Sequence, residues 1–182
     1  MSRAYKIHNP DGLYFVSFAT IGWVDVFTRL EYRKIIIDSL KYCQNQKGLL
    51  LYAWCLMTNH IHLIVKAKDG FELAGILRDF KKFTSRQLIK AIEDHPGESR
   101  KEWMLSKFRH AGAYNSNNKK YQFWQQNNKP IELWSTSVIQ QKLDYVHMNP
   151  VEAGFVEKPE EYLYSSARNF NESKGLLTLE PL

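Results

Sequence analysis

Two periodicities in the apolar positions divide the chain into strands and helices. Runs rich in β-branched and aromatic residues predict strands at 13–20, 49–57 and 60–66. Apolar residues spaced by three and four positions predict helices at 30–46, 71–92 and about 135–148. The second and third strands follow one another closely enough to form a hairpin. Helices interleaved with strands in this order indicate an α+β sandwich, in which helices pack on an antiparallel sheet.

Residues that favour termination mark the ends of the helices. Gly48 follows the first helix and is expected to end it. Ser135 and Ser137 are candidate N-caps of the third helix, and Pro150 is expected to stop that helix after about Met148. The inward stripe predicted for the second helix consists of Leu73, Ile76, Leu77, Phe80 and Phe83.

Weaker patterns occupy the stretch between the second and third helices and the end of the chain. Residues 94–100 break the helical pattern, and the signal stays weak as far as Lys120. A short strand at 121–125 is expected next, and the tail after Gly154 is expected to be irregular. Because no repeat or linker divides the chain, we expect one domain over residues 1–182.

Composition narrows the class of protein. Apolar residues make up 44% and charged residues 24% of the 182 positions, which is typical of a soluble globular protein and excludes disorder, collagen-like repeats and a coiled coil. With Cys43 and Cys55 as the two cysteines, a disulfide framework is excluded. The polar start of the sequence lacks a signal-peptide core, and the apolar runs are too short to span a bilayer. We therefore expect a cytoplasmic protein that does not enter a membrane.

The first candidate site is His60-Ile61-His62, in the third predicted strand. Side chains two positions apart on a strand point to the same face, with Cα atoms about 6.5 to 7 Å apart. Both imidazoles could therefore bind one divalent ion from a rigid platform. Two polar residues on a half-exposed strand would give the same pattern. The surrounding apolar residues favour the functional interpretation, because folding does not require polar residues in the middle of such a strand.

The second candidate site is one face of the third predicted helix. Gln141, Tyr145 and Asn149 are spaced four residues apart and share that face. The core stripe of the same helix is expected to be Val138 or Ile139, Leu143 and Val146. Tyr145 thus lies beside two amides that can ligate a metal or orient a phosphate. A tyrosine that packs at the edge of the core would show the same spacing.

Positive charge is concentrated in two segments. Lys and Arg number 25 against 19 Asp and Glu, which gives a net charge of +6 at pH 7. A ridge on the second helix, with Lys81 alongside, consists of Arg78, Lys82, Arg86 and Lys90. Further cations, among them Lys119 and Lys120, alternate with aromatic residues that can stack on unpaired bases. Like charges four residues apart on a helix repel one another unless a polyanion offsets the repulsion, so the ridge is a candidate DNA contact, as are Lys119 and Lys120. A solvated helix face has the same pattern.

Two motifs together resemble a known family. The first is Met-Thr-Asn-His-Ile-His-Leu at 57–63, and the second is Asp-Tyr-Val-His-Met-Asn-Pro-Val-Glu-Ala-Gly at 144–154. With Tyr-Leu-Tyr-Ser-Ser at 162–166, they resemble the single-tyrosine HUH transposases, and most closely the REP-associated tyrosine transposases of the insertion-sequence transposase family. The resemblance extends from about residue 14 to residue 170, and Thr58 stands where many members have Pro.

The resemblance implies a fold, a site and a reaction. The implied fold is a ferredoxin-like α+β sandwich, with the histidine pair on a central strand. His60, His62 and Asn149 match the positions of metal ligands, and Tyr145 matches the nucleophile. The implied enzyme is a DNA strand transferase and endonuclease that uses Mg²⁺ or Mn²⁺. It would cleave and rejoin single-stranded or hairpin DNA through a 5′-phosphotyrosine, as a monomer or homodimer associated with the nucleoid.

Two alternatives remain open at this stage. A domesticated protein could keep the fold and bind DNA hairpins without cleaving them, although the intact site residues argue against this. A structural zinc site could instead combine the histidine pair with Cys43 or Cys55. If the strand runs unbroken, Cys55 has the opposite parity to His60 and His62 and faces the other side of the sheet, which argues against the zinc site.

Overall fold

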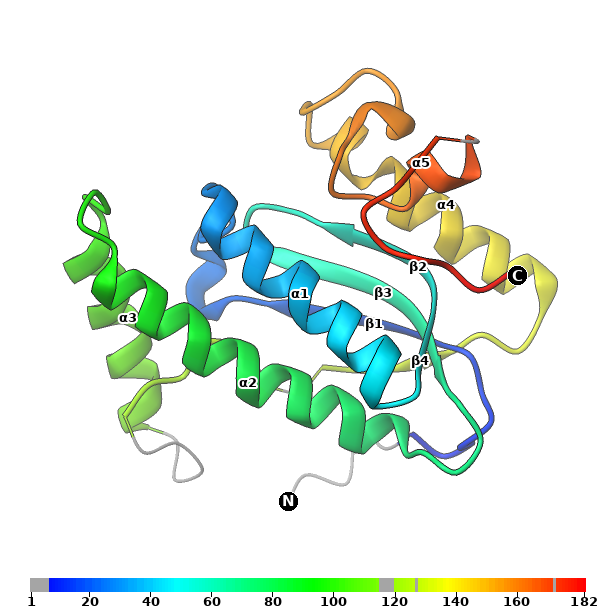
Figure 1. The fold of residues 1–182 in the computed structure, drawn as a ribbon, viewed down its shortest axis with the longest axis horizontal. Coiled ribbons are helices and arrows are strands. Elements are labelled where there is room, and N and C mark those ends of the chain that lie inside the picture. The colour runs from blue at the N-terminus through cyan, green and yellow to red at the C-terminus, as the bar shows by residue number, and fades with distance from the viewer. Residues whose placement is uncertain (1–6, 115–119, 127, 172) are drawn as a thin grey trace.

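A computed structural model describes residues 7–114, 120–126, 128–171 and 173–182 (Figure 1). The strands are β1 (Tyr14–Ala19), β2 (Leu49–Leu56), β3 (His60–Ala67) and β4 (Ile131–Glu132). The α-helices are α1 (Leu30–Gln46), α2 (Leu73–Asp94), α3 (Lys101–Ala113), α4 (Thr136–Glu152) and α5 (Ala167–Phe170). Two short 3₁₀ turns are η1 (Ile21–Trp23) and η2 (Pro159–Glu161).

The four strands form one antiparallel sheet in the order β2-β3-β1-β4. Strands β1 and β3 are central, and their register pairs Ser17 with His62 and Ala19 with His60. Helix α1 connects β1 to β2, and α2 follows the β2–β3 hairpin, so the arrangement is ferredoxin-like. The predicted α+β sandwich and its antiparallel sheet are confirmed.

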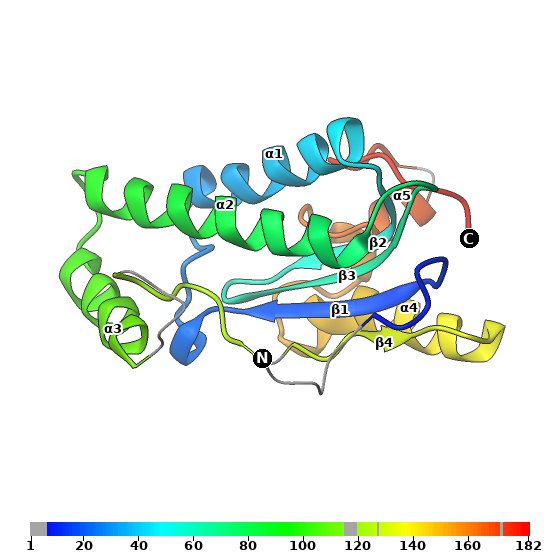
Figure 2. The same ribbon diagram turned by 90° about the horizontal axis from the view of Figure 1, so that it is seen from below.

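Helices cover both faces of the sheet, as Figure 2 shows. Helices α1 and α2 lie on one face and enclose the larger apolar core, which includes Phe27, Tyr32 and Trp54. Helix α4 lies on the opposite face over a smaller cluster that includes Phe15, Leu143 and Val146. Alternation of side chains along the strands supplies both cores, and it places the histidine pair on the α4 face.

Several predicted boundaries are confirmed. Helix α1 spans the predicted residues, and Gly48 just beyond it has a φ of +69°, the left-handed conformation that ends many helices. The β2–β3 hairpin closes through a bond from the Met57 amide to the His60 carbonyl, at 2.8 Å. Ser135 caps α4, because its Oγ accepts a hydrogen bond from the Val138 amide at 3.3 Å.

Two predictions about the helices are wrong. Helix α4 continues through Pro150 to Glu152. Pro150 lies in the final turn, so the one amide hydrogen bond that it cannot make, to the Val146 carbonyl, is lost close to the end of the helix, and its ring is buried. On α2, Phe83 is 53% exposed, whereas Thr84 is buried and accepts a hydrogen bond from the indole of Trp124. The inward stripe therefore shifts by one residue after Phe80.

The middle of the chain differs most from expectation. Helix α3 was not predicted, because its buried residues Met104, Leu105 and Phe108 alternate with charged positions. The predicted strand at 121–125 is absent from the described structure, where Trp124 makes only an isolated bridge to Thr20. The short strand β4 follows instead and pairs with the start of β1.

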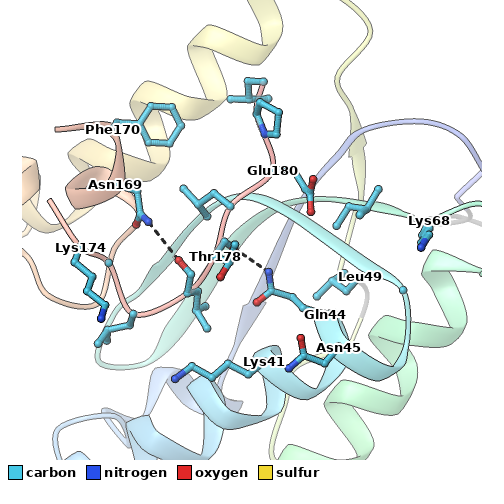
Figure 3. Close-up of a pocket in the computed structure, with 18 residues that line it drawn as sticks. Lys41, Gln44, Asn45, Leu49, Lys68, Asn169, Phe170, Lys174, Thr178 and Glu180 are labelled. Atoms are coloured by element: carbon cyan, nitrogen blue, oxygen red, sulfur yellow. Dashed lines mark hydrogen bonds between the residues drawn. The ribbon is translucent and has the colours of Figure 1, made fainter. Parts of the chain in front are cut away.

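The tail covers the free edge of β2. The Tyr164 carbonyl accepts from the Leu56 amide, and the amides of Ser166 and Glu180 donate to β2 carbonyls, each at 2.8 Å. Covering an edge strand in this way prevents it from pairing with another chain. The tail also forms a pocket of about 1050 Å³ with α1, where Gln44 donates to the Thr178 carbonyl (Figure 3).

No helix in the described ranges combines the length and the apolar character needed to cross a membrane.

Candidate active site

The two histidines of the first motif lie side by side at one end of β3. Their ring centroids are 4.6 Å apart, and both rings line a pocket of about 550 Å³ on the α4 face. His62 is 5% exposed, and His60 is partly exposed at the mouth of the hairpin. The prediction that both imidazoles share one face is confirmed.

Helix α4 brings Tyr145 to the same pocket. Its ring centroid lies 5.1 Å from the His62 ring and 5.8 Å from the Phe15 ring, and 43% of the residue is exposed. Leu143 and Val146 anchor this helix to the sheet from the neighbouring positions. The tyrosine is thus held beside the histidines by a rigid element and remains accessible to a large substrate.

Asn149 completes the group one helical turn after Tyr145. Its Oδ1 lies 3.4 Å from His60 Nε2, across a sequence separation of 89 residues. Gln141, on the same helix face, is exposed and does not line this pocket. The structure therefore brings together four of the five residues of the two candidate sites, namely His60, His62, Tyr145 and Asn149.

Both histidines are held in the neutral form. Burial lowers the pKa of His62 to about 3, and electrostatic interaction with the His60 imidazole and the Lys142 ammonium contributes in the same direction. Burial also lowers the pKa of His60, partly offset by Asn149 and Asp25. A neutral imidazole has a free lone pair, which is the form that binds a metal ion.

The donor set fits a divalent cation. His62 Nε2 is buried and has no hydrogen-bond partner among the described residues, while its Nδ1 lies 2.5 Å from Ser17 Oγ. An unpaired buried nitrogen is costly unless a ligand completes it. The described residues contain no group of three His, Cys, Asp or Glu side chains suited to a metal, and the donor atom that lies beside His60 is Oδ1 of the Asn149 amide.

Sequence reasoning missed several residues around the site. Ser17 pairs with His62 across the sheet, a neighbour that only the strand register identifies. Lys142, three residues before Tyr145, places its Nζ 5.5 Å from the Tyr145 ring centroid, which helical spacing could have indicated. Trp23 and Lys129 also line the pocket, and no local pattern marks them.

The basic ridge is not brought to this site. Arg78, Lys82, Arg86 and Lys90 are exposed on α2, which covers the opposite face of the sheet (Figure 2). Arg78 and Lys90 also form surface ion pairs with neighbouring aspartates. The ridge is therefore separated from the histidines by the thickness of the sheet.

The remaining basic residues differ in their exposure and contacts. Lys120 is exposed, with its Nζ 4.9 Å from the Tyr121 ring centroid, and Lys119 lies outside the described residues. Lys81 is not part of a solvated ridge: its Nζ donates to the Gln125 carbonyl and to Asn128 Oδ1. Because Gln125 and Asn128 line the pocket, Lys81 fastens one wall of the site.

The cysteines do not form a metal site with the histidines. Cys55 pairs directly with His62 and shares its sheet face, so the parity prediction was wrong, because β2 and β3 are separate strands of a hairpin. The Cys55 thiol contacts Met57 Sδ at 3.7 Å, and burial raises its pKa to about 12. Cys43 lies on α1, in the core on the other face.

Comparison with known proteins agrees with the motifs. Residues 24–109 match the family model described as Transposase IS200 like, a range that contains His60 and His62 and ends before Tyr145. A solved REP-associated tyrosine transposase bound to a REP hairpin is similar over 100% of this chain and 93% of that chain, with a TM-score of 0.64 and 16% identity.

A second solved structure, a putative transposase from Deinococcus radiodurans, has a TM-score of 0.47 and 19% identity over 80% of this chain and 94% of that chain. Among the curated proteins, none matches this chain. The resemblance carried by the two motifs is thus confirmed: residues 24–109 match the IS200-like transposases, and the whole chain has the fold of a REP-associated tyrosine transposase.

Proposed function

We propose that this protein is a metal-dependent DNA transposase that cleaves and rejoins single-stranded or hairpin DNA through Tyr145. One observation carries the proposal: the ring centroids of Tyr145 and His62 are 5.1 Å apart, in the pocket where His60 Nε2 lies beside Asn149 Oδ1. A nucleophile, two neutral imidazoles and an amide oxygen are thereby gathered from two elements. The IS200-like family match and the hairpin carried by a protein of the same fold support DNA as the substrate.

His60, His62 and Asn149 are the residues that would hold Mg²⁺ or Mn²⁺. A divalent cation bound by neutral ligands keeps its full charge and stabilises the negative charge that develops on a phosphate under attack. The chain contributes the two lone pairs, because burial keeps both imidazoles neutral. It also contributes rigidity, since β3 is a central strand.

Tyr145 performs the covalent step. Its phenolic oxygen attacks the phosphorus of the scissile phosphodiester, and the phenolic proton passes to solvent. A bond forms between the tyrosine oxygen and phosphorus, and the bond from phosphorus to the 3′-oxygen breaks. The leaving oxygen takes up a proton, which yields a free 3′-hydroxyl and a 5′-phosphotyrosine. Attack by a 3′-hydroxyl on that phosphotyrosine reverses the step and rejoins a strand without ATP.

Neighbouring side chains orient the tyrosine and the phosphate. Phe15 packs edge-on against the Tyr145 ring, and the Lys142 ammonium lies over both rings, at 5.0 and 5.5 Å. The ammonium places a positive charge where the phosphate must approach. Because Tyr145 lines a pocket together with the histidines, a flexible single strand or a hairpin end would fit this site better than a regular duplex.

A covalent adduct is the test of this proposal. We would incubate the full chain with labelled hairpin DNA and Mn²⁺ and look for a protein–DNA adduct that resists denaturant. The wild type and the matched control Tyr42→Phe, an exposed tyrosine on α1, are expected to form the adduct. Tyr145→Phe is expected to bind the DNA and form no adduct.

The outcomes separate the competing functions. If the wild type binds hairpins of varied sequence and never forms an adduct, the protein is a binding module without cleavage activity. If Tyr145→Phe still forms the adduct, the nucleophile is another residue. Mixing Tyr145→Phe with His62→Ala tests whether one chain supplies the whole site: complementation would indicate exchange between two copies, and we expect none.

A further inference from the structure

The turn before the histidine pair is clamped by a strained segment, η1. Trp23 has a φ of +53°, a left-handed conformation that is rare for a bulky residue, and Gly22 before it has a φ of +62°. Such strain persists only where surrounding contacts enforce it. In this conformation the Trp23 carbonyl accepts a hydrogen bond from Asn59 Nδ2, at 3.3 Å.

Two acceptors fix the orientation of the Asn59 amide. Asn59 Nδ2 donates to the Trp23 carbonyl and to Asp25 Oδ1, the latter at 3.1 Å. A carbonyl and a carboxylate can only accept, so the amide nitrogen must face them. The Asn59 Oδ1 atom therefore points the other way, toward His60. Thr58 donates separately to the same Asp25 oxygen, at 2.6 Å.

The orientation of Asn59 in turn fixes the proton on His60. Asn59 Oδ1 lies 2.6 Å from His60 Nδ1, and an amide oxygen can only accept. The Nδ1 atom must carry the hydrogen, which leaves Nε2 with a bare lone pair. His62 lacks this constraint, because its Nδ1 partner is the Ser17 hydroxyl, which can donate or accept.

The bare lone pair faces another acceptor. His60 Nε2 lies 3.4 Å from Asn149 Oδ1, so two groups without a proton between them point at one position. A cation at that position would satisfy both. Histidine ligands of metals usually donate their second ring hydrogen to a carbonyl or carboxylate, which sets the tautomer.

We infer that Asp25 and the Trp23 carbonyl orient Asn59, which holds His60 as the Nδ1–H tautomer and presents Nε2 to a divalent cation. Asp25 and Asn59 are thus positioning residues that act through His60. The inference deepens the proposed function, since the cation belongs to the proposed active site. The tautomer itself is a property of the metal-free protein and is measured without DNA.

Long-range nitrogen–proton correlation spectra of the imidazoles, recorded on the metal-free full chain, test the tautomer directly. The wild type is expected to show His60 with its hydrogen on Nδ1, the less populated form of a free imidazole side chain. Asn59→Ala is expected to shift His60 toward the Nε2–H form. Thr58→Val is the matched control, because it removes a bond to Asp25 and leaves the Asn59 amide in place.

Calorimetric titration with Mn²⁺ supplies the second readout. Asn59→Ala is expected to weaken Mn²⁺ binding about 10- to 100-fold, the usual effect of removing a partner of a metal ligand, whereas Thr58→Val stays close to wild type. Asp25→Asn keeps an oxygen that accepts from Asn59 and is expected to retain the tautomer, while Asp25→Ala is expected to lose part of it.

Two results would overturn the inference. One is a wild-type His60 that carries its hydrogen on Nε2, and the other is a tautomer that Asn59→Ala leaves unchanged. Equal loss of Mn²⁺ affinity in Thr58→Val and Asn59→Ala would show a general effect on the turn and would also overturn it. Failure of adduct formation with an intact tautomer would instead count against the proposed function alone.

Discussion

Glu98 joins the loop before α3 to the segment that precedes α1. Its side chain is 0% exposed and accepts hydrogen bonds from Arg29 Nε at 2.7 Å and from Arg100 Nε at 3.2 Å. Arg100 also donates to the Asp25 carbonyl at 2.9 Å, so the carboxylate stabilises the strand of chain that orients Asn59. The change Glu98→Gln keeps the shape of the side chain and removes its charge.

The loss of stability expected for Glu98→Gln follows from the pKa of Glu98. Burial would raise this pKa, but hydrogen bonds from Arg100 and Arg29 outweigh it and hold the pKa at about 2, against an ordinary value of 4.5. At 1.36 kcal/mol for each tenfold change in proton affinity, the difference corresponds to about 3 kcal/mol. Arg29 and Arg100 are 33% and 35% exposed. Because solvent screens them, we expect Glu98→Gln to lower the free energy of unfolding at pH 7 by about 2 to 3 kcal/mol.

The pH dependence tests the cause. A carboxylate whose pKa is lowered on folding stabilises the protein fully above its unfolded pKa, and this stabilisation is lost as the pH falls from 4.5 toward 2. Urea unfolding between pH 7 and pH 2.5 should therefore show the wild type approaching Glu98→Gln. Glu157→Gln, at an exposed position, is the control. A difference between wild type and Glu98→Gln that stays constant down to pH 2.5 would refute the reasoning.

Four further outcomes are expected. Ser135→Ala removes the N-cap of α4 and should lower the free energy of unfolding, measured with urea, by about 1 kcal/mol. An unchanged free energy would mean that the cap does not stabilise the helix. Val146→Ala opens a cavity beneath α4 and should lower the free energy of unfolding by about 2 kcal/mol. It should also reduce adduct formation more than DNA binding. An equal reduction of both would contradict the role of this helix in placing Tyr145. Burial lowers the pKa of Lys81 to about 8 from 10.5. Between these two pH values the unfolded chain binds more protons than the folded one, so the wild type should gain stability relative to Lys81→Met as the pH rises. Parallel pH profiles of the two proteins would exclude a buried ammonium. EDTA should abolish adduct formation and Mn²⁺ should restore it; adduct formation that persists in EDTA would exclude a metal-dependent step.

The part of the site that could be predicted from the sequence is the part set by local periodicity. His60 and His62 share a face because strand side chains alternate, and Tyr145 and Asn149 share one because they lie a helical turn apart. Each pair could be identified within its own element. The meeting of the two pairs follows from the packing of α4 on the sheet, and in the sequence it was indicated only by the family resemblance.

The unpredicted features depend on contacts between distant segments. Ser17 reaches His62 through strand register, and Asp25 reaches Asn59 across the hairpin turn. The positive ridge follows the helical period correctly, but which side of the sheet α2 covers is a tertiary property. Helix α3 could not be predicted because it has few apolar residues. Packing against neighbouring elements stabilises it more than its own helical propensity does.

The division of the site between β3 and α4 also has a consequence for synthesis. His60 and Asn149 are 89 residues apart, so a growing chain displays both imidazoles long before the tyrosine leaves the ribosome. A polypeptide interrupted before Tyr145 would present both imidazoles but would lack the proposed nucleophile and the amide of Asn149. On the function proposed above, cleavage of DNA would require a chain that has been translated through α4 and has docked that helix on the sheet, so incomplete products would not nick DNA.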